Sequence, residues 1–297
     1  MGQSYRNPIG VARFAAIYSE NTLFFTPNLT SVTPPLILIF GPVDPTGADG
    51  LPADAVTSAH LGCHGLAAAT ALTVQDTAVI EDIHPVSAEL LDDQARCLLE
   101  DMPVQAIKVG GLYSAETASV VAQIAADYSQ VPLVLHLGQR GLLSQQVPAE
   151  DDAENMLAAT LELILPQTNL AVVDFARLSQ WHTDGDINIG EAPSPMHALI
   201  AGGAQWVLVL GSTLRPGHKV NILLGPDGQT ATWPWQAPPE RLNDTGGIVA
   251  IAATAMLARG LDMPTAVERA LHHTESTYAN AFLPGMGRRL LNRVGTL

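Results

Sequence analysis

The sequence predicts an α/β protein with a three-layer α/β/α architecture, built on a mostly parallel central sheet. Apolar, β-branched runs of strand length recur along the chain, and helix-like amphipathic segments separate most of them. Near-continuous apolar strands are typical of parallel sheets that helices cover on both faces. In such sheets ligands bind beyond the carboxyl ends of the strands, so we expect the site at that rim.

Six apolar runs are predicted to form strands of this sheet. They are LILIF (36–40), ALTVQ (71–75), AIKVGGL (106–112), PLVLHL (132–137), NLAVVDF (169–175) and WVLVLGS (206–212). Between most of them lie segments with helical periodicity, for example residues 115–129 and 153–166. The alternation places the loops after these strands together on one rim.

The pattern changes after the last of these runs. VNILLG (220–225) and TATWPW (230–235) are joined by PDGQ, as in a β-hairpin. Two helices are predicted to follow, at about 245–259 and 264–281.

The predicted domain organisation is simple. Residues 1–34 are interpreted as an irregular N-terminal arm that ends in TPP, and residues 35–297 as a single domain. No linker, repeat or low-complexity tract divides the second segment. With 297 residues, of which 47% are apolar, the chain can bury a substantial core.

Charge and cysteine content limit the expected partners. The chain carries 29 acidic and 14 basic side chains, and the net charge of −15 argues against nucleic acid or an anionic membrane surface as a partner. Cys63 and Cys97 give no disulfide framework, which favours a reducing compartment. The N-terminal apolar run VARFAAIY is too short to span a membrane. We therefore expect a cytoplasmic protein.

The loop after the first strand is a candidate binding site. FGPVDPTGADGLPAD (40–54) is rich in Gly and Pro, so its backbone can approach a ligand closely. Asp54 follows on the next helix, and Gln75 ends the next strand. A carboxylate and an amide on one rim can bind the donor and acceptor edge of a small heterocycle. In the alternative interpretation, Asp54 pairs locally and Gln75 satisfies a loop carbonyl.

A second candidate lies in ERLNDTGGIVAIAATAMLARG (240–260). A glycine-containing turn that opens a helix presents backbone N–H groups and the positive end of a helix dipole, an arrangement that holds phosphate. Asn243 and Asp244 stand where an anion would bind. Because a carboxylate can cap these same N–H groups, we expect Asp244 to hinder phosphate binding.

Four motifs in order, PVDPTGADGLPAD, GCHGLAAATALTVQDT, IKVGGL and the DTGG turn, give the sequence a resemblance to a known family. From about residue 36 to the C-terminal region it resembles the hydroxymethylpyrimidine/phosphomethylpyrimidine kinases of thiamine biosynthesis, which have the ribokinase-like fold. The resemblance implies a pyrimidine-type small-molecule ligand, ATP with Mg²⁺, and a homodimer.

The resemblance also assigns site residues. Those that it places at the substrate are Asp44, Gly47, Gly50, Asp54, Gln75, Lys108 and Gly110. Those that it places near the nucleotide are Asn221, Thr245 and Gly246. No metal ligand is assigned, because the histidines lack metal-ligand spacing on a common face.

Several positions depart from the family pattern. The turn that usually reads GTGC or GSGC is DTGG here, so Asp244 replaces a glycine and Gly247 replaces the residue that activates the substrate hydroxyl. His136 stands in place of a carboxylate, and Asp174 in place of an asparagine. Thus Asp244, Thr245, Gly246 and Gly247 form a remnant of the anion-binding turn, with no certain catalytic residue.

Three hypotheses remain open from the sequence. In the first, the chain is a catalytically weakened or inactive family member that still binds a small molecule, and it binds ATP weakly. In the second, it is an active hydroxymethylpyrimidine/phosphomethylpyrimidine kinase in which another group or water replaces the missing base. In the third, it is a kinase of changed small-molecule specificity.

Overall fold

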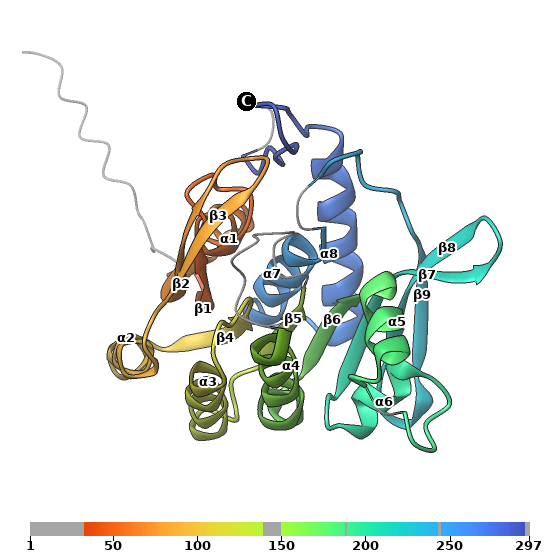
Figure 1. Ribbon diagram of the computed structural model, residues 1–297, viewed down its shortest axis with the longest axis horizontal. Coiled ribbons are helices and arrows are strands. Elements are labelled where there is room, and N and C mark those ends of the chain that lie inside the picture. The colour runs from red at the N-terminus through yellow and green to blue at the C-terminus, as the bar shows by residue number, and fades with distance from the viewer. Residues whose placement is uncertain (1–32, 139–149, 188, 243–244, 295–297) are drawn as a thin grey trace, which may run out of the picture. The chain divides into compact units, whose positions relative to one another are not determined.

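The computed structural model describes residues 33–138, 150–187, 189–242 and 245–294, and its centre is a nine-stranded sheet (Figure 1). The strand order is β3-β2-β1-β4-β5-β6-β7-β8-β9. The strands are β1 (Leu36–Val43), β2 (His64–Gln75), β3 (Ile80–Pro85), β4 (Val104–Val109), β5 (Leu133–Leu137), β6 (Leu170–Asp174), β7 (Trp206–Arg215), β8 (His218–Leu224) and β9 (Thr230–Pro234). Apart from its last two residues, the predicted N-terminal arm lies outside the described residues.

The centre of the sheet is parallel and its edges are antiparallel. Strands β2, β1, β4, β5, β6 and β7 run in the same direction. Strand β3 pairs antiparallel with β2 at one edge, and β8 and β9 form the predicted hairpin at the other. The predicted fold class is therefore confirmed, and the six parallel strands are the six apolar runs of the sequence.

Side chains of β1 alternate between two cores, as expected for a strand buried on both faces. Leu38 and Phe40 pack on one side, whereas Ile37 and Ile39 pack on the other. The second side is covered by three helices, α1 (Gly50–His60), α7 (Thr245–Ala258) and α8 (Met263–Tyr278). The first side is covered by α2 (Ala88–Asp101), α3 (Ala115–Asp127), α4 (Glu150–Ala159), α5 (Phe175–Asp184) and α6 (Pro195–Ala201) (Figure 1).

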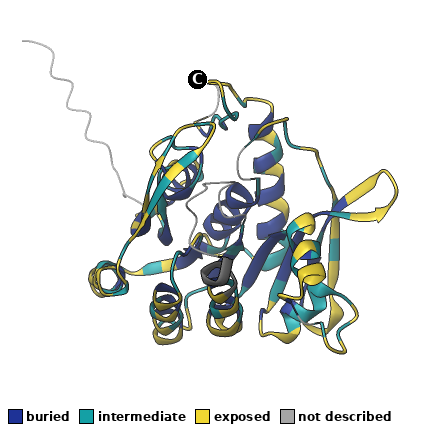
Figure 2. Cartoon of the chain, in the orientation of Figure 1, coloured by how far each residue is buried: buried dark blue, intermediate teal, exposed yellow. Residues whose placement is uncertain are grey.

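Helix α7 lies deepest in the protein (Figure 2). All but two of its 14 residues are buried, and most of them are alanine, glycine or β-branched residues. Small side chains let the helix pack close to the sheet, where it contacts β4, β5 and β6. This packing fixes the N-terminus of α7 at the rim where the parallel strands end.

The structure differs from the sequence-based expectation in two elements. Strand β3 was not predicted, because IEDIHP is largely polar and contains Pro85, a pattern that edge strands tolerate. The helix expected over 153–166 is α4 followed by a π-helical turn (Thr160–Ile164) and a 3₁₀ turn (Leu165–Gln167). Proline at position 166 lacks the N–H that a longer α-helix would need.

In the described part of the chain, no helix combines the length and the apolar character that crossing a membrane requires.

Candidate functional site

A pocket of about 1200 Å³ opens at the carboxyl edge of the parallel strands. Its walls are the ends of β1, β2, β4, β5 and β6 with the loops that follow them, the middle of β7, and Thr245 at the start of α7. This is the rim that the strand and helix alternation predicts. Of the ten predicted substrate and nucleotide residues, the pocket gathers Asp44, Gly50, Asp54, Gln75, Lys108, Gly110 and Thr245.

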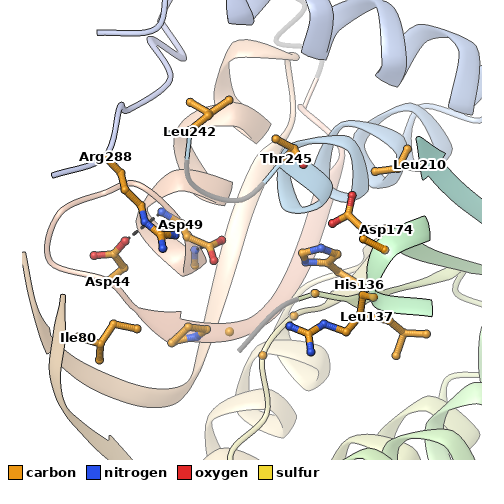
Figure 3. Close-up of a pocket in the computed structure, with 18 of the residues that line it drawn as sticks. Asp44, Asp49, Ile80, His136, Leu137, Asp174, Leu210, Leu242, Thr245 and Arg288 are labelled. Carbon is orange, nitrogen blue, oxygen red and sulfur yellow. Dashed lines mark hydrogen bonds between the residues drawn. The ribbon is translucent and has the colours of Figure 1, made fainter. Parts of the chain in front are cut away.

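The loop between β1 and α1 is organised by Asp44. Its carboxylate accepts hydrogen bonds from the Thr46 backbone N–H at 2.7 Å, from the Thr46 hydroxyl and from the Asp49 backbone N–H at 3.0 Å. Figure 3 shows Asp44 and Asp49 side by side in the pocket. Asp49 in turn caps α1, because its carboxylate accepts from the Gly50 N–H at 2.6 Å. Asp44 therefore fixes the loop from within.

Glycines give this loop its shape. Gly47 and Gly50 have φ angles of +69° and +62°, which residues other than glycine rarely adopt. A Cβ on Gly50 would lie 2.2 Å from the Pro42 carbonyl oxygen, so that position requires glycine. Gly47 shapes the turn, with its N–H donating to the Asp44 carbonyl at 3.1 Å, while Gly50 also lines the pocket.

A buried ion pair forms the floor of the pocket. Lys108 at the end of β4 places Nζ 2.5 Å from Oδ2 of Asp54 on α1, and the two side chains are 2% and 3% exposed. Burial raises the pKa of Asp54 above its ordinary value, while the Lys108 ammonium opposes that rise. Asp54 thus pairs with a residue 54 positions away and not with a local partner. The contact with the ligand that the sequence predicts for Asp54 would therefore be made by the ion pair as a whole.

Gln75 and Gly110 stand at the ends of β2 and β4, the two strands that flank β1 in the sheet. Gln75 ends β2, is half-buried and lines the pocket. The Gly110 N–H donates to the Phe40 carbonyl at 2.8 Å, and a Cβ at this position would lie 3.2 Å from that oxygen. Glycine therefore lets the β4 loop pass close to β1 and keeps the floor open.

His136 lies opposite this wall, at the end of β5. Its ring is packed between two glycines, since a Cβ on Gly138 or on Gly246 would lie 2.6 Å from a ring atom. Burial and the nearby Lys108 ammonium lower the pKa of His136 to about 3, so the imidazole is neutral at physiological pH. The histidine that departs from the family pattern is thus in contact with the turn that opens α7.

Asp174 ends β6 on the same side of the pocket. Burial raises the pKa of this carboxyl group, and the Arg177 guanidinium opposes the rise. Figure 3 shows His136 and Asp174 beneath Thr245, across the pocket from Asp44 and Asp49. Within the described residues, no group of three His, Cys, Asp or Glu side chains is arranged to hold a metal ion.

Asn221, a predicted nucleotide residue, has a clear internal role. Its Oδ1 accepts from the Gly211 N–H at 3.1 Å, and its Nδ2 donates to the Pro234 carbonyl at 3.4 Å. It therefore joins β7 to the end of β9, and it lines a second, small cavity with Trp235 and Thr245. The indole of Trp235 packs against Gly211, and Lys219 lies 4.8 Å from the centre of a Trp235 ring.

The turn that the sequence analysis singled out is described in part. Asn243 and Asp244 lie outside the described residues. Thr245, Gly246 and Gly247 form the first turn of α7, and the two glycines are buried. The predicted capping by Asp244 therefore stays a prediction.

Sequence reasoning missed the contribution of the C-terminal segment. Met286, Gly287 and Arg288 line the pocket, and the Arg288 N–H donates to the Thr77 carbonyl at 2.7 Å. The run PGMGRR (284–289) carries a signal, since closely spaced glycines indicate a close backbone approach. The residue that this segment approaches, Thr77, lies more than 200 residues earlier in the chain.

Comparison with known proteins gives a consistent result. The family described as phosphomethylpyrimidine kinase matches residues 44–292. A hydroxymethylpyrimidine/phosphomethylpyrimidine kinase of Mycobacterium bovis is 34% identical over 252 residues, which cover 80% of this chain and 86% of the relative. The protein of the same name from Streptomyces coelicolor is 29% identical over 265 residues, covering 86% and 93%.

Solved structures share the fold. Phosphomethylpyrimidine kinase from Clostridium difficile aligns with a TM-score of 0.66 at 19% identity, covering 82% of this chain and 98% of that one. Pyridoxal kinase from Staphylococcus aureus in complex with AMP-PCP aligns with a TM-score of 0.74 at 19% identity, covering 88% and 94%. The family match spans the pocket from Asp44 to the C-terminal segment, and the chain belongs to the phosphomethylpyrimidine kinase family.

Proposed function

We propose that the protein is an active, ATP-dependent kinase that phosphorylates the hydroxymethyl or phosphomethyl group of an aminopyrimidine in thiamine biosynthesis. One observation carries the proposal. A single pocket joins the Asp44–Gly50 loop and Gln75 to Thr245 at the N-terminus of α7. An acceptor bound on one side would therefore face a phosphate bound on the other.

The acceptor half suits an aminopyrimidine. The ring of such a compound carries an amino donor and nitrogen acceptors, which an amide and a carboxylate–ammonium pair can bind together. Gln75 on the wall and the Lys108–Asp54 pair on the floor supply these groups. The names of the curated relatives support the same class of acceptor.

The phosphate half suits the triphosphate of ATP. The first turn of α7 offers backbone N–H groups and a positive dipole end, and the Thr245 hydroxyl lines the pocket beside them. Asp174 could hold Mg²⁺ together with the phosphate oxygens, which prefer this hard cation. When bound, Mg²⁺ would neutralise phosphate charge, whereas the residues of this chain position the two reactants.

A second candidate function is a weakened catalyst that retains small-molecule binding. Gly247 favours it, because glycine in the first turn of α7 supplies no group that could take the hydroxyl proton. A positioned base contributes typically about 10²- to 10⁴-fold to a rate. In this case binding of the pyrimidine would persist while ATP bound weakly.

Steady-state turnover decides between the two. ATP consumption and product formation should be measured with hydroxymethylpyrimidine and with its monophosphate, beside calorimetric binding of each compound alone. We expect turnover of both acceptors, and Lys108→Met, which breaks the ion pair at the floor, should abolish it. Binding of either acceptor without turnover would establish the second candidate, and absence of both binding and turnover would reject the acceptor class.

We also propose that the protein is a homodimer, as its resemblance to the family implies, and that it acts in the cytoplasm, which its cysteine content favours. Sedimentation equilibrium at micromolar concentration tests the assembly, and a monomer there would contradict it.

A further inference from the structure

The segment 282–290, which we call the C-terminal loop, is closed on itself and tied to the pocket rim. Phe282 and Leu290 exchange two backbone hydrogen bonds of 2.9 Å, which close the loop at its base. Its far end reaches the turn between β2 and β3. There the Arg288 N–H donates to the Thr77 carbonyl at 2.7 Å, and the Gly287 N–H donates to the Thr77 hydroxyl at 3.3 Å.

The fit between this loop and Thr77 is close. A Cβ on Gly287 would lie 2.2 Å from the Thr77 carbonyl oxygen, and one on Gly285 would lie 3.0 Å from its hydroxyl oxygen. Real Cβ atoms are not found at the shorter distance, so Gly287 lets the two backbones meet. The contact holds the residue after Gly287 at a fixed place on the rim, and that residue is Arg288.

Two further attachments hold the loop. The Arg289 N–H donates to the Arg241 carbonyl at 2.8 Å, which joins the loop to the segment before α7. Beyond the loop, the buried Arg293 donates from its two terminal nitrogens to the Thr57 hydroxyl at 3.0 Å and to the Ala48 carbonyl at 2.8 Å. The C-terminal loop is thus bound to two separate segments at the pocket, and the chain that follows the loop is anchored to α1 and the loop before it.

Arg288 enters the side of the pocket formed by the β1–α1 loop and the β2–β3 turn, which we call the acceptor side. Figure 3 shows its side chain directed toward Asp44 and Asp49, whereas His136 and Asp174 lie on the opposite side. Trp235 and Lys219 line a different part of the pocket, next to β7. Arg288 therefore lies where the acceptor is proposed to bind, and not next to β7.

The charge of the acceptor side makes this position important. Asp44, Asp49 and Asp54 all line it, and Lys108 is paired with Asp54. A phosphate monoester carries between one and two negative charges at neutral pH, so these carboxylates would repel it. An arginine offers a planar set of donors that binds two phosphate oxygens at once.

We propose that Arg288 is a specificity-determining residue that binds the phosphate monoester of a phosphorylated acceptor. This inference rests on the proposed function, because it concerns the phosphomethyl form of the proposed substrate. The hydroxymethyl form has no such group and does not need this contact. Arg288 thereby makes the same pocket suitable for a neutral acceptor and for its monophosphate.

The test compares two acceptors in three proteins, by calorimetric binding without nucleotide. The acceptors are hydroxymethylpyrimidine and its monophosphate, and the proteins are the wild type, Arg288→Gln and Arg288→Lys. Arg288→Gln should weaken monophosphate binding by about 10- to 100-fold, the scale of a lost hydrogen bond to a charged group. It should change binding of the unphosphorylated compound by less than about 3-fold, and Arg288→Lys should fall between.

Arg269→Ala is the matched control, since this arginine is exposed on α8 and does not line the pocket. Its affinities for both acceptors should equal those of the wild type. Thermal melting of each variant checks that the fold is intact. The melting temperature should not change, because the Arg288 N–H bonds to Thr77 without the arginine side chain.

Each other outcome overturns the inference. An equal loss for both acceptors would show that Arg288 only shapes the pocket, and no loss for either would show that it makes no contact. If wild-type protein turns over both acceptors and Arg288→Gln keeps their affinity ratio, the inference fails while the proposed function stands. If wild-type protein binds neither acceptor, both fail.

Discussion

The imidazole of His136 rests against the backbone of Gly246, so closely that a Cβ on this glycine would lie 2.6 Å from Nε2. The ring lies equally close to a second glycine, since a Cβ on Gly138 would be 2.6 Å from its Cε1. The end of β5 and the first turn of α7 are thereby locked together at the place where phosphate is proposed to bind. The packing explains how a histidine is accommodated at 136, because glycine at both 138 and 246 leaves room for its ring.

This contact predicts a strong coupling between His136 and Gly246. Gly246→Ala forces the ring or the helix to move, and overpacking of this kind costs about 1–3 kcal/mol of unfolding free energy. In the background of His136→Ala the added methyl group meets no ring, so the cost of the second change should largely disappear. Urea denaturation of the two single variants and the double variant measures the coupling.

Gly41→Ala is a suitable control for this cycle. A Cβ at Gly41 would meet Leu51 at an ordinary 3.8 Å, and its φ is not among the positive values. It should cost little in either background. If the costs of Gly246→Ala and His136→Ala simply add, the two residues are not in contact in solution.

His136 should also make the protein sensitive to acid. Its pKa in the folded state is lowered to about 3, from an ordinary value near 6.5, so between these values the unfolded state binds the additional proton. Stability must therefore fall as the pH decreases below about 6.5. From pH 7 to pH 5 this single group should remove roughly 2 kcal/mol of unfolding free energy.

The measurement is the free energy of unfolding at pH 7 and pH 5, for the wild type and for His136→Asn. The variant should lose less stability on acidification than the wild type does. His273 has its pKa lowered to about 4 by burial and adds its own share, so some acid sensitivity should remain. His182→Asn, at an exposed position on α5, serves as the control and should keep the wild-type difference.

Much of the fold could be predicted because its central strands are buried on both faces. LILIF and NLAVVDF are apolar at every core position and need little context to identify. Strand β3 could not be predicted in this way, since its partner β2 supplies the hydrogen bonds and its own sequence is polar. The local hydrophobic pattern predicts strands that are completely buried. It does not predict a strand that forms only because it pairs with a neighbouring strand.

The site was predictable to a similar extent. Asp44, Gln75 and Lys108 stand at strand ends, and topology brings strand ends together. The ion pair between Lys108 and Asp54, and the contact between Thr77 and Gly287, join segments that are distant in the sequence. Such pairings depend on how helices and loops return to the sheet, which residue spacing does not reveal.

The ion pair at the pocket floor yields a third prediction. Lys108→Met leaves Asp54 buried and without its partner, and breaking a buried pair on one side typically costs about 3–5 kcal/mol. The double variant Lys108→Met/Asp54→Leu should regain much of this loss. Chemical denaturation provides the values, and Arg96→Met, which breaks two partly exposed pairs with Asp92 and Asp127, should cost only about 0.2–1 kcal/mol for each pair. If Lys108→Met and Arg96→Met cost the same unfolding free energy, the floor of the pocket is hydrated.

Gln75 provides a fourth prediction, for binding. If its amide contacts the heterocycle, Gln75→Ala should weaken acceptor binding by about 1–3 kcal/mol, because a polar partner is left unpaired. Calorimetry with hydroxymethylpyrimidine measures the change. Gln123→Ala, on the exposed face of α3, should leave the affinity unchanged. An unchanged affinity for Gln75→Ala as well would remove this residue from the site.

The last prediction concerns what limits the rate at the first turn of α7. If the protein is a weakened kinase, Gly247→Cys returns a group that can take the hydroxyl proton, and it should raise the rate of phosphoryl transfer. Asp244 lies outside the described residues, and in the sequence it replaces a glycine of the family turn. Removing its charge should favour phosphate at the same place.

The double variant Asp244→Gly/Gly247→Cys should therefore gain more than the two single changes together, because both act on one transferring phosphate. Single-turnover measurements with saturating ATP separate this gain from any change in nucleotide binding. The active-kinase proposal predicts a different result: wild-type protein already transfers at an ordinary rate, and neither substitution raises it. In that case the catalytic group is supplied elsewhere in the pocket, and His136, in contact with the same turn, is the first residue to replace.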